Sequence, residues 1–160
     1  MRRHTAVGGA GVLALVGAAL ASDVPGPDAL LDRLRHEHHG VQWDPDSGVA
    51  ADLDGDGRAD AAVLGVAAER VIVAVGTTPI GVEMRVQYLE FPVSGSAALG
   101  VCRLPVRLKR EPQACAPDDA PLPGCRILAG AAGLALEDGE CDAVHLYWDH
   151  DAQRVAVWRR

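Results

Sequence analysis

The chain has 160 residues, with 15 Lys and Arg against 22 Asp and Glu, and a formal net charge of −7 at pH 7. This length is typical of a single domain. The acidic balance argues against nucleic acid or anionic lipid as a partner, because both would be repelled.

The N-terminal segment has the pattern of a secretory signal peptide. A short basic stretch, Met1 to His4, precedes an uncharged apolar run from Ala6 to Leu20, and Ala19-Leu20-Ala21 matches a small-x-small cleavage site. The run is short and rich in Ala and Gly for a membrane span, although an uncleaved anchor is the alternative. We expect residues 1–21 to be removed, which takes Arg2 and Arg3 away and brings the net charge to −9. Residues 22–160 are then a single periplasmic or secreted domain with no membrane association.

The mature chain is predicted to open with one helix. Pro25-Gly26-Pro27-Asp28 is a helix start signal, with proline and an acid in the first turn. Leu30, Leu31 and Leu34 then form an apolar stripe, and Gly40 is suited to end the helix.

From Ser47 onward the periodicity changes to that of strands. The segment from Arg70 to Val75 is rich in β-branched residues, which predicts a buried strand. The segment from Val82 to Tyr88 alternates between apolar and polar residues, which predicts an antiparallel strand with one solvent-exposed face. The predicted strands are Gly48 to Ala51, Ala61 to Val66, Arg70 to Val75, Val82 to Tyr88, Leu99 to Leu108 (interrupted or ended by Pro105), Asp142 to Trp148 and Arg154 to Trp158. We therefore expect a mainly β (α+β) fold, a small antiparallel sheet or sandwich with one N-terminal helix. Trp43, Trp148 and Trp158 are expected to anchor its core.

The four cysteines all lie in the second half of the chain, at Cys102, Cys115, Cys125 and Cys141. An even number in an exported chain predicts two disulfides, and the absence of a C-x-x-C pair argues against zinc. Three pairings are open, of which we favour the neighbours, Cys102–Cys115 and Cys125–Cys141. The segment from Glu111 to Gly124 is rich in proline and acid and is expected to be a long loop ordered by these cysteines.

The most informative stretch is Asp52-Leu53-Asp54-Gly55-Asp56-Gly57-Arg58-Ala59-Asp60. Carboxylates this close repel one another, and a cation removes the repulsion. Hard oxygen ligands select Ca²⁺, and glycine allows the chain to wrap around the ion. The spacing resembles the first part of an EF-hand loop, but the twelfth position, which requires Glu, is Val63, and the segment that follows is a predicted strand.

The D-x-D-G-D-G-x-x-D pattern before an apolar strand resembles the calcium loop of the FG-GAP/VCBS repeats found in integrin α-subunit propellers. The resemblance covers Val49 to Val66 and implies that Asp52, Asp54, Asp56 and Asp60 are side-chain ligands and Arg58 a carbonyl ligand of a structural Ca²⁺. A propeller needs several repeats, whereas this chain contains one.

The C-terminal segments Cys141 to Trp148 and Trp158-Arg159-Arg160 also resemble the ends of uncharacterised exported bacterial proteins that carry one such loop. That resemblance implies no activity.

No nucleophile elbow, phosphate loop, dinucleotide fingerprint or metal-hydrolase motif occurs in the sequence. His145 and His150 are close in sequence to Asp142, Asp149 and Asp151, a set compatible with acid–base chemistry, but strand alternation favours an exposed strand histidine at position 145. We expect an exported calcium-binding β domain, a binding or structural module without catalytic activity, whose partner is an unknown protein or glycan. Two alternatives stay open: an enzyme inhibitor or other interaction protein, and a hydrolase that uses His145 and the nearby acids.

Overall fold

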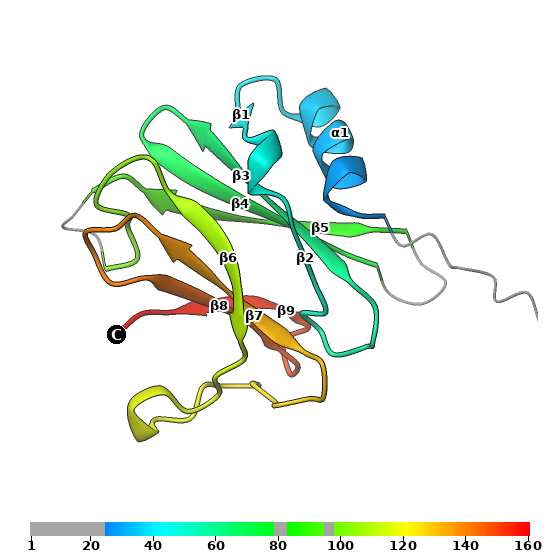
Figure 1. The fold of residues 1–160 in the computed structure, drawn as a ribbon, viewed down its shortest axis with the longest axis vertical. Helices are drawn as coiled ribbons and strands as arrows, with labels where there is room; N and C mark the ends of the chain where they lie inside the picture. The colour runs from blue at the N-terminus through cyan, green and yellow to red at the C-terminus, as the bar shows by residue number, and fades with distance from the viewer. Residues whose placement is uncertain (1–24, 79–82, 95–97) are drawn as a thin grey trace, which may run out of the picture.

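The computed structural model describes residues 25–78, 83–94 and 98–160. The predicted signal peptide and Val82, the first residue of one predicted strand, lie outside these residues. One helix, α1 (Pro27–Glu37), lies on the first of two antiparallel sheets, and the second sheet lies below the first (Figure 1). The predicted fold class, mainly β with one N-terminal helix, is confirmed.

The two sheets contain consecutive parts of the chain. The first sheet has the order β1-β3-β4-β5, with β2 also paired to β3, and comprises β1 (Gln42–Trp43), β2 (Val49–Ala51), β3 (Asp60–Ala67), β4 (Arg70–Thr77) and β5 (Arg85–Pro92). The second has the order β6-β7-β8-β9 and comprises β6 (Arg107–Pro112), β7 (Ala132–Glu137), β8 (Val144–Asp149) and β9 (Arg154–Trp158). Two short 3₁₀ helices, Pro45–Ser47 and Pro117–Asp119, lie in the connections.

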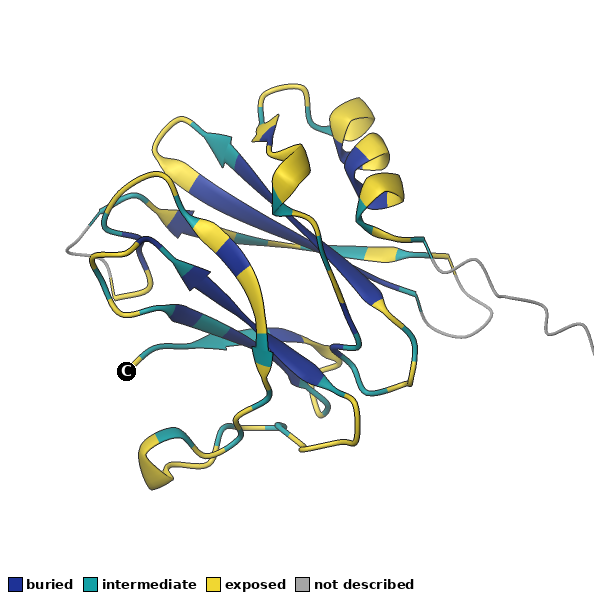
Figure 2. Ribbon diagram, viewed as in Figure 1, coloured by how far each residue is buried: buried dark blue, intermediate teal, exposed yellow. Residues whose placement is uncertain are grey.

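Strand β4 is buried on both faces, which explains its continuous apolar sequence. Val71, Val73 and Val75 join the core between the sheets, whereas Ile72 and Ala74 join a second core under the helix. Figure 2 shows the buried residues concentrated along the central strands. The molecule therefore has three layers: helix, first sheet and second sheet.

Helix α1 forms because its leucines cover the outer face of the first sheet. Leu30 and Leu34 are completely buried, and they pack with Val63 of β3. The helix ends at Glu37, ahead of Gly40, because the backbone of His38 leaves the helical conformation. The His38 ring there accepts or donates a 2.9 Å hydrogen bond with the hydroxyl of Tyr88 on β5.

Three local expectations are wrong. Of the predicted strand from Leu99 to Leu108, only Arg107 and Leu108 lie in a named strand, since β6 begins beyond Pro105, whose nitrogen cannot donate to a ladder. Strand β6 then continues to Pro112, into the predicted loop. Strand β7 was not predicted, because its Ala-Gly-Leu-Ala-Leu-Glu sequence lacks β-branched residues; it is a strand because it lies between β6 and β8.

The disulfide pairing also differs from the expectation. Cys102 is bonded to Cys141, and Cys115 is bonded to Cys125. The cause is the antiparallel pairing of β6 with β7, in which Arg107 lies opposite Glu137. Residues just before β6 are thereby placed beside residues just after β7, and the second disulfide closes the loop that joins these strands.

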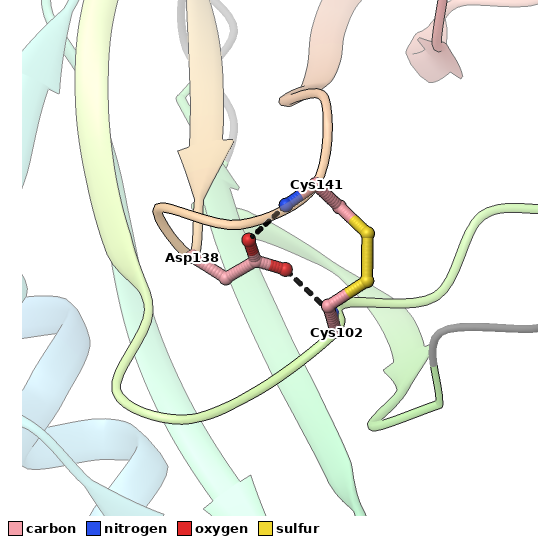
Figure 3. Close-up of side chains that lie close together, drawn as sticks. All are labelled: Cys102, Asp138 and Cys141. Atoms are coloured by element: carbon pink, nitrogen blue, oxygen red, sulfur yellow. Dashed lines mark hydrogen bonds between the residues drawn. A yellow bond between two sulfur atoms is a disulfide. The ribbon is translucent and has the colours of Figure 1, made fainter.

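Asp138 lies next to the first disulfide and connects its two ends (Figure 3). Its Oδ1 accepts hydrogen bonds from the backbone N–H groups of Glu140 and Cys141, both at 2.8 Å, and its Oδ2 accepts one from the N–H of Cys102. The close approach of Cys102, Asp138 and Cys141 is therefore explained by the disulfide and these bonds, without a metal ion.

The C-terminal hairpin is confirmed, with β8 and β9 joined through residues 150–153. Trp43 and Trp148 are buried as expected, but Trp158 is not part of the core. Val155 and Val157 turn toward the core, so alternation places Trp158 on the outer face, where it stacks on His145 with ring centroids 4.1 Å apart.

Candidate metal centre and adjoining cavity

The acidic loop joins β2 to β3, two neighbouring antiparallel strands in which Ala51 lies opposite Asp60. Leu53, at the start of the loop, is buried in the core between the sheets. Gly55 and Gly57 have φ values of 77° and 84°, a conformation that favours glycine. The sequence thus folds locally into a tight loop that buries Leu53 and Asp60 and leaves Asp52, Asp54 and Asp56 half-buried or exposed.

Three of the predicted ligands lie together. Carboxylate oxygens of Asp52, Asp54 and Asp56 all lie within 4.8 Å of one another. Two oxygens bound to one Ca²⁺ lie at most about 5 Å apart, since each Ca–O distance is about 2.5 Å. The spacing of this donor set is compatible with one shared divalent cation.

Hydrogen bonds within the loop hold the three carboxylates in place. The two oxygens of Asp52 accept from the N–H groups of Gly55 at 2.7 Å and Gly57 at 3.0 Å. Asp54 and Asp56 each accept, through Oδ1, from the N–H group two residues further on, at 3.0 and 2.8 Å. Asp54 and Asp56 thus each keep a second oxygen for other ligands.

Asp60 lies outside this group and is largely buried, with 4% of its surface exposed. Its Oδ2 accepts hydrogen bonds from the N–H of Leu53 at 2.9 Å and of Asp54 at 3.4 Å. Burial raises the pKa of Asp60 to about 7, helped by the negative charges of Asp54 and Asp56 and opposed by these two bonds. In this geometry Asp60 holds the first half of the loop, and its role as a fourth ligand stays a prediction.

The acids of the loop are not paired with basic side chains. Among the described residues, none of Asp52, Asp54, Asp56 and Asp60 forms an ion pair with Lys, Arg or His. The guanidinium of Arg58 donates instead to the carbonyl of Thr78, at 2.9 Å. The predicted role of the Arg58 carbonyl as a ligand stays a prediction. Burial also raises the pKa of Asp54, and the charges of Asp56 and Asp52 add to this rise.

The loop is fastened to the second sheet as well as to the first. The N–H of Ala132, the first residue of β7, donates to the carbonyl of Asp52 at 2.8 Å. Leu128 packs so closely on the loop that a Cβ at Gly55 would come within 2.3 Å of its side chain. The acidic loop is therefore a junction between the two sheets.

A cavity of about 330 Å³ lies beside the loop. Asp54 and Asp56 form part of its wall, and residues from β4, β5 and the C-terminal hairpin form the rest: Val75, Thr77, Arg85, Val86, Gln87, Trp148, Gln153 and Val155. Gln87 joins the two sheets here, since its side chain donates to the Val155 carbonyl and accepts from the Val155 N–H, both at 2.8 Å. The polar face of β5, which was expected to be exposed to solvent, thus faces the second sheet.

His145, the residue of the hydrolase alternative, forms no hydrogen bond or ion pair with Asp142, Asp149 or Asp151 in the described part of the chain. Its Nδ1 lies 2.8 Å from Glu111 on β6, and its other ring contact is Trp158. Asp149 accepts from the N–H groups of its own turn, and Asp151 pairs with Arg126. The structure thus pairs His145 with Glu111 and not with the acids of the hydrolase alternative.

Sequence reasoning missed the residues that line the cavity, among them Arg85, Gln87 and Gln153. It also did not associate His150 with Asp54, whose raised pKa is opposed by the charge of His150. The one available signal was the polar side of the predicted strand from Val82 to Tyr88, which was interpreted as solvent-facing. Only the position of the second sheet shows that this side lines a cavity.

No family model, curated protein or solved structure matches this chain. In the part of the chain that the structure describes, no helix is long and apolar enough to cross a membrane. The two disulfides point to a non-reducing environment.

Proposed function

We propose that the chain is an exported calcium-binding β domain in which the ion has a structural role. The observation that carries the proposal is the convergence of Asp52, Asp54 and Asp56 to within 4.8 Å, without an ion pair to a basic side chain among the described residues. Three carboxylates are hard ligands of the kind that Ca²⁺ prefers. The resemblance to a single FG-GAP/VCBS calcium loop supports the same ion.

The structural role of the ion follows from the contacts that the acidic loop makes with the core and with β7. Leu53 fixes it in the core, and the bond from Ala132 to the Asp52 carbonyl fixes it to β7. A cation that orders this loop would stabilise the junction between the sheets. Extracellular modules bind calcium at about 10⁻⁴–10⁻³ M, and calcium at ten times its Kd would add about 1.4 kcal/mol to the free energy of unfolding.

We place the domain in the periplasm or outside the cell. The two disulfides and the signal-peptide pattern support this location. In such a compartment we infer a binding or structural module whose partner is a protein or glycan. An inhibitor or other interaction protein is the alternative, and a stable stoichiometric partner captured from periplasm or culture medium would support it.

The calcium site is tested by thermal unfolding of the mature domain in millimolar CaCl₂ and in EDTA. We expect a higher Tm in calcium, because the ion binds only the folded loop. In Asp56→Asn the difference between the two conditions should shrink, since the variant loses a charged ligand but keeps an acceptor for the Arg58 N–H. The matched control is Asp119→Asn, an exposed acid in another loop, which should keep the full difference. Equal Tm values in calcium and EDTA for the unsubstituted domain would refute the proposal.

A further inference from the structure

The cavity beside the acidic loop has a polar end and an apolar floor. Val75, Trp148 and Val155 belong to the core between the sheets and form the floor. Its volume, about 330 Å³, lies at the lower end of the range for small-molecule sites.

The polar end interrupts the apolar pattern of the inner sheet face. Along β4, the inward residues before Thr77 are valines. Along β5, inward Phe91 and Leu89 are followed by Gln87 and Arg85, and Arg85 lies opposite Thr77 in the ladder. A sandwich packed only for stability places apolar residues on this face. The change from apolar to polar residues occurs where the two strands reach the acidic loop.

Opposite charges line this cavity without pairing. Arg85 forms no ion pair with any described acid, although Asp54 and Asp56 line the same space. Its exposed guanidinium offers a planar set of donors that matches a carboxylate. The remaining oxygens of Asp54 and Asp56 would be available to the cation of the proposed calcium site.

We propose that the cavity binds a small carboxylate with an apolar body, in a calcium-dependent manner. Arg85 and the cation held by Asp54 and Asp56 attract the carboxylate, and Val75, Val155 and Trp148 contact the apolar body. This inference rests on the proposed calcium site, because without a cation the two aspartates would repel an anion. Since the two sites are coupled, the ligand should in turn tighten calcium binding by the same factor.

The test is a ¹⁵N–¹H NMR titration of the mature domain with hexanoate, in calcium and in EDTA. Hexanol and hexylamine serve as neutral and cationic probes of similar size. We expect hexanoate to bind in calcium, to shift the Trp148 indole signal, and to bind at least about tenfold more weakly in EDTA. The indole signal of Trp158, which lies on the outer face, should not move.

Two variants distinguish recognition by Arg85 from general charge. Arg85→Gln removes the cation from the cavity and should weaken hexanoate binding at least about tenfold. Arg110→Gln, which removes an exposed arginine of β6 outside the cavity, should leave it unchanged. Arg85 is exposed, so its substitution should not disturb folding, and the Tm of each variant checks this.

If calcium binds but the affinity for hexanoate is equal in calcium and in EDTA, the inference is overturned and the proposed function stays intact. The same holds if Arg85→Gln binds hexanoate as tightly as the unsubstituted domain does. Binding of hexanol as tight as that of hexanoate would do the same. Failure of calcium to bind at all would overturn both, and tighter binding of hexylamine in that case would identify Asp54 and Asp56 as an amine site instead.

Discussion

At the scale of single residues, Asp138 organises one end of the second sheet. It is 8% exposed, and its carboxylate accepts the N–H groups of Cys102, Glu140 and Cys141. Burial by itself would raise the pKa of Asp138, but the three backbone donors and the charge of Arg159 outweigh this and hold the pKa below its ordinary value. A carboxylate with a lowered pKa stabilises the folded state in its ionised form.

We predict that Asp138→Asn lowers the free energy of unfolding by about 2 kcal/mol near neutral pH, because a charged acceptor of several bonds is lost. The ionised carboxylate contributes fully above the unfolded pKa of about 4, and its contribution is lost as the pH falls through the lower folded pKa. The difference between the two proteins should therefore be constant above about pH 5 and shrink below about pH 4. Urea unfolding across this pH range measures it.

The control for this experiment is Asp119→Asn, an exposed acid with positive φ, a conformation that asparagine tolerates. It should change the unfolding free energy by less than about 0.5 kcal/mol. A difference for Asp138→Asn that grows toward acid pH would contradict the assigned role of the carboxylate.

At the scale of elements, helix α1 closes the outer face of the first sheet. Leu30 and Leu34 are completely buried against residues of β3 and β4. The inner face of the same sheet packs on the second sheet through an independent set of side chains. Loss of helix packing should therefore weaken the fold without altering the acidic loop, which lies on the side of the second sheet.

We predict that Leu34→Ala costs about 2–5 kcal/mol of unfolding free energy, since it leaves a cavity under the helix. Leu99→Ala, at a residue that is 40% exposed, should cost less than about 1 kcal/mol. Denaturant unfolding monitored by circular dichroism gives both values. Similar losses in the two variants would show that the helix does not pack as described.

At the scale of the whole molecule, the two disulfides close loops of very different length. Cys102 and Cys141 are 39 residues apart, and Cys115 and Cys125 are 10 apart. In the chain-entropy model the first contributes about 4 kcal/mol and the second about 3 kcal/mol. The first also joins the ends of β6 and β7, whereas the second orders only the loop between these strands.

We predict that the double variant Cys102→Ser/Cys141→Ser loses more stability than Cys115→Ser/Cys125→Ser. Thermal unfolding of both variants beside the unsubstituted domain measures the difference, and peptide mapping under non-reducing conditions checks the pairing. A larger loss in the second variant, or peptides that link Cys102 to Cys115, would contradict the described connectivity.

Sequence by itself determined those features that depend on neighbouring residues. The leucine stripe predicted α1, β-branched and alternating segments predicted β4 and the first half of β5, and the crowding of four aspartates predicted the acidic loop. These predictions succeed because helix periodicity, strand propensity and charge repulsion act over a few residues.

Only the tertiary structure decided the features that depend on distant strands. The Cys102–Cys141 pairing follows from the register of β6 and β7, and β7 itself is a strand because it lies between two others. The sequence places Arg85 and Gln87 on a polar strand face. That this face lines a cavity depends on the position of the second sheet. Long-range pairing is set by the packing of the whole chain, which no short stretch of sequence contains.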